Sequence, residues 1–294
     1  MSIEKTPDFA QDHGVVKMIY KAAASADIAV QRVRENIAVL SGSGANITVF
    51  HGRNGKLLVD AGMAVSLQKI GNALDKLGGG SIDLLVNTHW HFDHTDGNEW
   101  VHAAGAAIIA HENTRKHMST ETRVDDWNFT FPPSPDGALP SRLVSNADAL
   151  DFNGTRILIE YYGPAHTDGD LSVTFEEFDV MNVGDTWWNG SYPFIDYSTG
   201  GSIGGTIEAT ERNIAKGSDD TVFIPGHGPP GDLDQVIEYR DMLITVRDRV
   251  AALKKQGESL DNIILAKPTN GFDQQWGCFL ITPEMFVRLV WAGV

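Results

Sequence analysis

The sequence predicts an α/β fold, because strand-like segments alternate with segments that have helical spacing. From residue 37 onward, short apolar runs rich in β-branched side chains are separated by glycine and asparagine, as in 37–40, 46–50 and 56–60. Such runs are typical of strands. Between Ala64 and Leu77, apolar residues recur at the spacing of one helix face, and three glycines end the segment. Together these patterns indicate a mixed α/β architecture.

The order of the elements follows from the same patterns. The first three strands form a meander, with Gly52-Arg53-Asn54-Gly55 as a hairpin turn. Residues 120–147 are rich in proline and aromatic side chains, have no clear period and interrupt the alternation. Further strands are expected at 84–86, 106–110, 155–161, 171–175, 180–183 and 221–224, and helices at 96–104, from 112 onward, at 206–216, at 233–255 and at 283–291.

No linker-like segment divides the chain, so we expect a single domain over residues 1–294. Its core should span about 35–230, followed by a mostly helical C-terminal extension over 231–294. A chain of 294 residues can bury a sizeable core without disulfides or a structural metal. Any metal ligands in the sequence are therefore expected to serve chemistry.

The charge balance excludes several classes of partner. Lys and Arg total 23 against 39 Asp and Glu, a net charge of −16, which repels nucleic acid and anionic membrane surfaces. No apolar run approaches the length of a membrane span. We expect a cytoplasmic protein, or a periplasmic or secreted one if a signal peptide has been removed. The single cysteine, Cys278, excludes an internal disulfide and is expected to be buried.

The segment Thr88-His89-Trp90-His91-Phe92-Asp93-His94 places four potential metal ligands within six residues at the end of an expected strand. In extended backbone, side chains two residues apart share a face, so His89 and His91 can converge on one cation. The turn that follows can direct Asp93 and His94 toward a second cation. A purely structural loop would have to satisfy the hydrogen bonds of all these buried groups, which is costly.

Three later strand ends carry further candidates. His166 lies in the loop Tyr162-Gly-Pro-Ala-His-Thr, Asp185 follows Val183-Gly184, and His227 lies in Pro225-Gly-His-Gly. Small neighbours let the backbone bring such ligands close together. With the first cluster they supply five imidazoles and two carboxylates, a set that fits two metal sites better than one.

The order His-x-His-x-Asp-His, Gly-x-x-His-Thr, Gly-Asp and Pro-Gly-His-Gly resembles the metallo-β-lactamase superfamily over residues 35–230. The resemblance implies a four-layer αββα sandwich with a binuclear site in the cleft between its sheets. It also implies that Asp60 supports the site by contacting the ligands without binding a metal itself. The implied ligands are His89, His91 and His166 for the first metal, Asp93, His94 and His227 for the second, and Asp185 as a bridge between them.

Within this superfamily, the residue types favour particular branches. Asp185 stands where dedicated β-lactamases tend to carry Cys or Ser, and it resembles the bridging Asp of glyoxalase II and the lactonases. His91, in place of Glu, argues against the flavodiiron oxidoreductases. The expected function is hydrolysis of a small ester, lactone, thioester or cyclic amide with two zinc ions, for which iron or manganese could substitute. Hydrolysis of β-lactam antibiotics and an iron-dependent oxidoreductase activity are the alternatives.

The expected mechanism follows from the ligands. Two metals can lower the pKa of bound water to about 7 and stabilise both the attacking and the leaving atoms. We expect a metal-bridging hydroxide to attack a carbonyl, with Asp93 orienting the nucleophile and relaying its proton.

The substrate is expected to be a small molecule that binds against Trp187, Trp188 and Tyr192, which follow Asp185 directly. Core packing of these aromatic side chains is the alternative, and the segment 127–131 is the next candidate for a substrate wall. The sequence also allows the protein to form a homo-oligomer.

Overall fold

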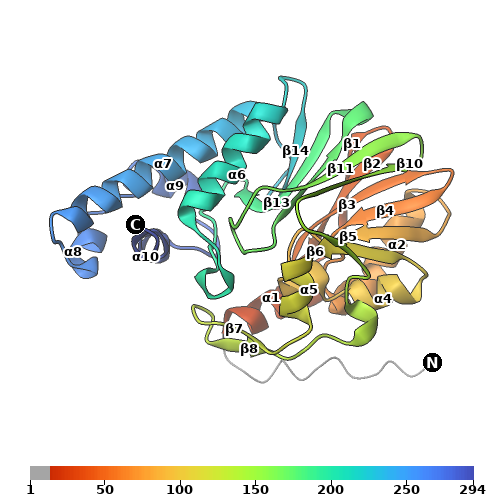
Figure 1. Cartoon of the computed structure of the whole chain (residues 1–294), viewed down its shortest axis with the longest axis horizontal. Coiled ribbons are helices and arrows are strands. Elements are labelled where there is room, and N and C mark those ends of the chain that lie inside the picture. Colours follow the sequence, from red (N-terminus) through yellow and green to blue (C-terminus); the bar gives the residue numbers. More distant parts are fainter. Residues whose placement is uncertain (1–13) are drawn as a thin grey trace. The chain divides into compact units, whose positions relative to one another are not determined.

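The computed structural model describes residues 14–294, which group into two compact units (Figure 1). The first unit takes the described residues up to Tyr161 together with Leu171–Phe178. The second unit takes Tyr162–Asp170 and Asp179–Val294. The expectation of one domain over 1–294 stays a prediction.

A seven-stranded sheet forms the centre of the first unit. Its first four strands pair antiparallel, and the remaining strands add in parallel next to β4. Gly52 lies opposite Gly55 across the expected hairpin turn. In sheet order the strands are β1 (Ala29–Arg34), β2 (Ile37–Ser43), β3 (Ala45–Gly52), β4 (Gly55–Val59), β5 (Ile82–Val86), β6 (Ala107–His111) and β9 (Arg142–Val144).

Helices cover one face of this sheet. Ile70 and Leu74 of α2 (Leu67–Lys76) and Val101 of α4 (Asn98–Ala103) pack with Leu58 and Leu85 of the sheet in one buried apolar cluster. The helix expected at 64–77 is confirmed as a 3-10 turn (Ala64–Ser66) followed by α2, whereas the helix expected at 96–104 is shorter. The helices of this unit are α1 (Val15–Ser25), α2 (Leu67–Lys76), α3 (Phe92–Thr95), α4 (Asn98–Ala103) and α5 (Glu112–Met118), with a further 3-10 turn at Asp136–Ala138.

Three antiparallel strands of the first unit pack on the other face of the large sheet: β10 (Ala147–Phe152), β11 (Thr155–Tyr161) and β12 (Leu171–Phe175). The ring of Phe50 on β3 lies 6.1 Å from that of Phe152 and 5.5 Å from that of Phe175. This unit alone therefore has three layers, one of helices and two of strands. A 3-10 turn at Glu176–Phe178 follows β12.

Residues 120–147, which showed no clear period in the sequence, contain a small hairpin of β7 (Thr122–Val124) and β8 (Phe129–Phe131). Each strand has three residues, too few for a visible alternation of apolar and polar side chains. The same stretch then supplies β9, the last strand of the large sheet.

The second unit contains two parallel strands and all the helices described after residue 200 (Figure 1). A capping box of Asp232 and Gln235 starts α7 (Leu233–Lys255), and helices α6 (Ile203–Lys216) and α10 (Pro283–Ala292) both pack against α7. The elements are β13 (Val180–Trp188), a 3-10 turn (Tyr197–Thr199), α6 (Ile203–Lys216), β14 (Val222–His227), α7 (Leu233–Lys255), α8 (Leu260–Leu265), α9 (Asp273–Trp276) and α10 (Pro283–Ala292).

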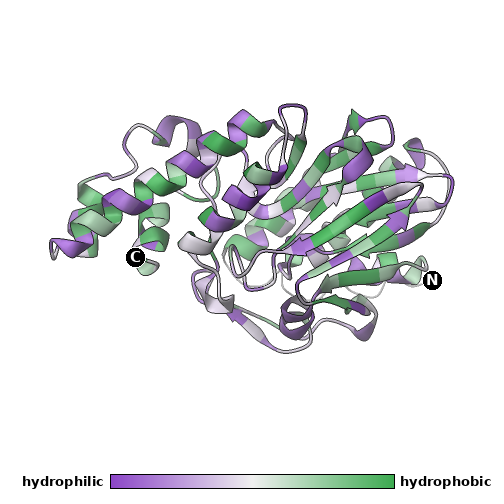
Figure 2. Ribbon diagram, turned by 45° about the horizontal axis from the view of Figure 1, so that its top comes forward, coloured by the Kyte–Doolittle hydropathy of each residue, from purple (hydrophilic) through white to green (hydrophobic). Residues whose placement is uncertain are grey.

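Hydrophobic residues concentrate on the strands, whereas the connecting turns are largely hydrophilic (Figure 2). Among residues 14–294, none of the helices combines the length and the apolar character needed to cross a membrane. The expectation that Cys278 is buried was wrong, because this residue is exposed in the turn between α9 and α10. Its Sγ lies 3.6 Å from the carbonyl oxygen of Gln274.

Candidate metal centre

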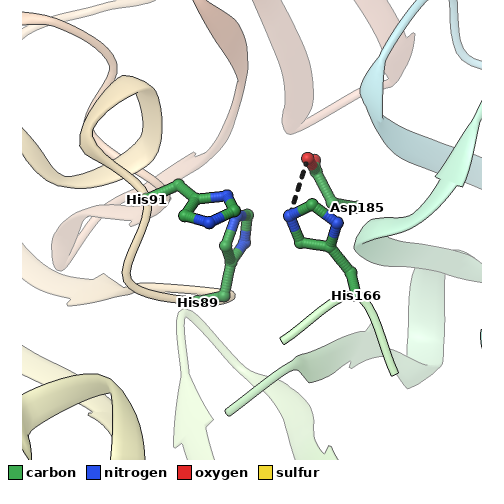
Figure 3. A group of neighbouring side chains, drawn as sticks. All are labelled: His89, His91, His166 and Asp185. Carbon is green, nitrogen blue, oxygen red and sulfur yellow. Dashed lines mark ion pairs between the residues drawn. The ribbon is translucent and has the colours of Figure 1, made fainter. Parts of the chain in front are cut away.

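The first set of candidate ligands follows strand β5 and belongs to the first unit. His89 and His91 precede α3, and Asp93 and His94 lie within its single turn, so that all four side chains are buried. The ring centroid of His89 lies 4.7 Å from that of His91 and 4.1 Å from that of His94. Figure 3 shows the His89 and His91 rings side by side. The expected convergence of these imidazoles is therefore present within the unit.

Asp60, immediately after β4, holds this cluster in a defined orientation. One carboxylate oxygen accepts the backbone N–H of Thr88 at 2.8 Å, and the other accepts the Thr88 hydroxyl and Nδ1–H of His94, each at 2.8 Å. Because the hydroxyl hydrogen of Thr88 is donated to Asp60, the hydroxyl oxygen of Thr88 is free to accept the Nδ1–H of His89, at an oxygen–nitrogen distance of 3.1 Å. Both imidazoles therefore present Nε2 as the atom for a metal.

Replacing Asp60 with asparagine is expected to weaken zinc binding roughly 10- to 100-fold, the usual cost of losing a carboxylate behind a ligating histidine. Asparagine tolerates the left-handed backbone of residue 60 (φ 63°), but its amide cannot accept all three hydrogen bonds. Competition with a fluorescent zinc chelator measures the change, and Asp75→Asn on the exposed side of α2 is the matched control. An unchanged zinc affinity in Asp60→Asn would contradict this role.

Asp93 approaches the backbone between β2 and β3 so closely that only glycine fits there. A Cβ on Gly44 would lie 2.7 Å from the Cβ of Asp93, and the φ of Gly44 is 81°. Such a backbone conformation and such a contact both disfavour any other residue. The position of Asp93 thus depends on a residue that lies outside the ligand motif.

The second set of candidate ligands belongs to the second unit. His166 lies in the loop before β12, Asp185 lies within β13 and His227 ends β14. His166 donates Nδ1–H to the carbonyl oxygen of Phe194 at 2.8 Å, so its Nε2 faces the ligand side. Nε2 of His166 and Nε2 of His227 each lie 3.4 Å from Oδ2 of Asp185, and Figure 3 draws the first of these ion pairs. Two imidazoles thus converge on one carboxylate oxygen.

Gly226 explains why Asp185 can occupy this position. The parallel pairing of β13 with β14 brings the two strands together, and a Cβ at residue 226 would collide with Oδ1 of Asp185. The glycine of Pro-Gly-His-Gly therefore leaves the space that the carboxylate fills, and the histidine that follows it is a candidate ligand.

Two buried residues of the second unit, Asp170 and Tyr239, have pKa values that the charge of Asp185 raises. Burial raises the pKa of the Asp170 carboxyl well above its ordinary value, and the charge of Asp185 raises it further. Asp170 accepts hydrogen bonds from the backbone and hydroxyl of Thr167, which fixes the loop after His166. Burial and then Asp185 likewise raise the pKa of the Tyr239 hydroxyl, so this phenol stays protonated.

The sequence analysis missed these supporting residues. Thr88 contacts the candidate ligand His89, Asp170 fixes the loop after His166 through Thr167, and Tyr239 feels the charge of Asp185. Thr88 directly precedes His89 in sequence, and its place in the motif is the only local signal. Tyr239 lies on α7, twelve residues after His227, and no local pattern points to it.

The expected substrate wall divides into two kinds of residue. Trp187 is fully buried with its ring 6.4 Å from Phe223, and Tyr192 stacks on Phe286 at 4.5 Å. The structure favours core packing for these two side chains. Trp188 is also buried, at 3% exposure, but its ring centroid lies 4.4 Å from that of the candidate ligand His227.

Trp127, at the turn of the β7–β8 hairpin, lies beside a candidate ligand of the first unit. Its ring centroid is 5.0 Å from that of His91, and the side chain is half-buried. Arg123 holds the turn by hydrogen bonds to Asp125 at 2.7 Å and to Asn128 at 2.8 Å.

The chemistry of the donor set is that of a transition-metal site. The first unit offers three imidazoles and one carboxylate, and the second offers two imidazoles and one carboxylate. Within each unit, the ligand atoms that could share an ion, such as those of His89 and His91 or of His166 and Asp185, lie within 4.8 Å of one another. Imidazole and carboxylate suit zinc, iron and manganese, so these residues fit the expected metals.

Comparisons with known proteins agree with this chemistry. A family model described as the metallo-beta-lactamase superfamily matches residues 40–246, more than half of the chain. The "probable metallo-hydrolase MJ0888" of Methanocaldococcus jannaschii is 28% identical over 186 residues, which cover 60% of this chain and 84% of that protein.

Solved structures show the fold. The DIM-1 metallo-beta-lactamase is 18% identical, with a TM-score of 0.61, and the match covers 74% of this chain and 98% of that one. The stereoselective inverting sec-alkylsulfatase Pisa1 from Pseudomonas sp. is 16% identical, with a TM-score of 0.66. That match covers 97% of this chain, which spans about half (54%) of the sulfatase.

These neighbours confirm the expected α/β fold of the αββα type with a mostly helical C-terminal region. With a family model that covers most of its length and a His/Asp cluster suited to metal, the chain belongs to the metallo-beta-lactamase superfamily.

Proposed function

We propose that this protein is a binuclear metal-dependent hydrolase that attacks the carbonyl of a small ester, lactone, thioester or cyclic amide. The observation that carries the proposal is the convergence of two imidazole Nε2 atoms on one oxygen of Asp185, because a bridging carboxylate requires this arrangement. The proposed ligands are His89, His91 and His166 for the first metal, Asp93, His94 and His227 for the second, and Asp185 for both.

When bound, a pair of zinc ions would polarise the carbonyl and bring the pKa of water to about 7. The residues of the chain position the reactants around that chemistry. Asp60 and Thr88 orient the imidazoles of His94 and His89. Asp93 orients the attacking water and takes its proton. Trp127 forms an apolar wall next to His91 and keeps bulk water from that side of the substrate.

Asp185 also bears on the choice of substrate. A carboxylate at this position favours esters, lactones and thioesters, and a β-lactamase that acts on antibiotics remains the alternative within the same chemistry. An iron-dependent oxidoreductase is the alternative of another class. Elemental analysis and a substrate screen separate the three.

Sulfate ester hydrolysis is a second candidate reaction. One specific observation favours it: the match to the sec-alkylsulfatase includes nearly the whole chain, 97%, whereas the match to the β-lactamase covers 74%. The C-terminal extension is therefore part of the likeness to the sulfatase. Alkyl sulfates belong in the substrate screen for this reason.

Protein purified without chelator should contain about two equivalents of metal, as expected for a binuclear site. The zinc-loaded protein should hydrolyse members of a panel of lactones, thioesters, esters, β-lactams and alkyl sulfates, and protein treated with EDTA should not. Metal content near zero without uptake on zinc addition would contradict the binuclear site. Turnover that persists after complete metal removal would contradict metal-dependent hydrolysis.

A further inference from the structure

Two loops of the second unit are joined by hydrogen bonds around the candidate ligand His166. The first loop, 164–168, carries His166, and the second, 194–202, precedes α6. The Nδ1–H of His166 donates to the carbonyl oxygen of Phe194 at 2.8 Å, and the backbone N–H of Asp196 donates to the carbonyl oxygen of His166 at 2.9 Å. Both the imidazole and the backbone of His166 are therefore fixed by the second loop.

Two further backbone hydrogen bonds join the loops on either side of this contact. The N–H of Asp168 donates to the carbonyl oxygen of Thr199 at 2.9 Å, and the N–H of Ser202 donates to that of Ala165 at 2.7 Å. Ser202 also caps α6, because its hydroxyl oxygen accepts the N–H of Gly205 at 3.2 Å. The second loop is thus anchored at one end to a long helix.

The two loops approach so closely that only glycine fits at residue 201. A Cβ there would collide with the carbonyl oxygen of His166 and would lie 2.8 Å from that of Asp196. The N–H of Gly201 donates to this same Asp196 carbonyl at 2.8 Å. The backbone of the ligand loop therefore rests directly on the second loop, and a change in the shape of the second loop reaches His166 without an intervening side chain.

The carboxylate of Asp196 sets the shape of the second loop. The residue is fully buried, its Oδ1 accepts the N–H of Ser198 at 3.0 Å and its Oδ2 accepts the hydroxyl of Thr199 at 2.6 Å. Hydrogen bonds to a buried carboxylate are roughly twice as strong as those between neutral groups. Removal of the carboxylate deprives two donors of their acceptor, which favours a different path for the loop.

The orientation of His166 matters because the second nitrogen of its ring is the candidate metal ligand. Its Nε2 lies 3.4 Å from Oδ2 of Asp185, and Figure 3 shows the ring directed at that carboxylate. A hydrogen bond at Nδ1 fixes both the tautomer and the rotation of a ligating imidazole. Phe194, which accepts that bond, lies two residues before Asp196. A shift of the loop would therefore turn Nε2 away from Asp185.

We propose that Asp196 is a positioning residue that fixes the imidazole of His166 and thereby sets the affinity for the first metal. The inference rests on the ligand set of the proposed function and on none of its substrates. Asp196 acts through the carbonyl groups of the second loop, and it contacts neither metal nor substrate.

Zinc titration against a fluorescent chelator tests the consequence for the metal. Asp196→Ala should weaken one of the two zinc equivalents about tenfold, the lower end of the usual cost of losing a residue that supports a ligand, and the other by less than about twofold. Thr199→Val removes one hydroxyl donor with little change of shape, so it should weaken the same equivalent about threefold. Asp196→Asn keeps one acceptor and should lie between Asp196→Ala and the native protein.

Asp179→Ala is the matched control within the same unit. The Asp179 carboxylate also accepts two hydroxyl groups of a loop, those of Ser218 and Thr221, but that loop contains none of the candidate ligands. Asp179→Ala should lower the free energy of unfolding in urea and leave both zinc affinities unchanged. Equal weakening of both equivalents in Asp196→Ala would show general destabilisation and overturn the inference.

A measurement that needs no metal keeps the test decisive. In zinc-free protein, the Nδ1–H of His166 should give an imidazole N–H signal in NMR spectra that is absent in His166→Ala. The proton should exchange slowly with water, because the ring and its acceptor Phe194 are both buried. In Asp196→Ala and Thr199→Val the exchange should be at least about tenfold and about threefold faster, and in Asp179→Ala it should be unchanged.

The two measurements separate this inference from the proposed function. Faster exchange in Asp196→Ala, in a protein that binds no zinc, would support the positioning of His166 and reject the binuclear site. Native exchange, or native affinity for both zinc equivalents in a folded Asp196→Ala, would overturn the inference. If Asp196→Ala did not fold, Thr199→Val would decide by the same criteria.

Discussion

Asp185→Ala is expected to lower kcat/KM at least about a thousandfold, a loss of roughly 4 kcal/mol of transition-state stabilisation. Its Oδ2 lies 3.4 Å from Nε2 of both His166 and His227, so alanine removes the group on which both imidazoles converge. His166→Ala should act in the same direction. The fold should survive, because a chain of this size does not need a metal to stabilise its core.

The measurement combines kcat/KM on the best substrate of the screen, zinc stoichiometry and far-UV circular dichroism. Asp219→Ala, at an exposed aspartate, is the matched control and should keep native activity. Asp185→Ala that retained native turnover with zinc removed would refute the shared carboxylate. An unfolded Asp185→Ala would instead show that the carboxylate stabilises the second unit.

Trp187→Ala is expected to destabilise the protein by about 3–5 kcal/mol, as for other large aromatic residues removed from a core. The side chain is fully buried, its ring lies 6.4 Å from Phe223, and a Cβ on Gly231 would already approach the indole to 2.9 Å. Urea unfolding followed by circular dichroism measures the change in the free energy of unfolding.

Trp188→Ala is the informative partner of this experiment, because Trp188 lies against His227 instead of against Phe223. Because Trp188 is buried against this candidate ligand, Trp188→Ala should raise KM or change the substrate preference, with zinc stoichiometry retained. If Trp187→Ala changed KM and left the free energy of unfolding within about 0.5 kcal/mol, the core role of Trp187 would be wrong.

The sequence predicted the parts of the site that are local in the chain. The cluster from His89 to His94 was visible because its ligands lie within six residues, and strand ends with small neighbours marked His166, Asp185 and His227. The hairpin at Gly52 and Gly55 and the helix after Ala64 were likewise set by short-range patterns.

The roles of Trp187 and Trp188 could not be separated from the sequence. Alternation along a regular strand would place Trp187 on the face of Asp185 and Trp188 on the opposite face. However, the pairing of β13 with β14 is irregular between Gly184 and Trp188, where the register shifts. The irregularity places Trp188 opposite His227, and local propensity carries no information about such a shift.

The hairpin of β7 and β8 and the exposure of Cys278 were missed for related reasons. Three-residue strands do not establish a period, and the burial of a lone cysteine depends on which segments pack over it. The contact of Trp127 with His91 depends on that same hairpin. Unlike the hairpin, which is local, the contact of Trp127 with His91 and the exposure of Cys278 depend on how segments distant in sequence pack together.

The close approach of Gly226 to Asp185 links two positions that are 41 residues apart in sequence. A carboxylate at 185 leaves no room for a methyl group at 226, whereas a shorter side chain at 185 would remove this collision and leave the backbone of Gly184, at 3.0 Å, as the nearest neighbour. The two positions should therefore covary among relatives: an aspartate at the first should occur with glycine at the second, and alanine at the second should occur only with a smaller residue at the first. Evolutionary exchange of the proposed bridging residue would then require the pair to change in order, with position 185 changing before position 226.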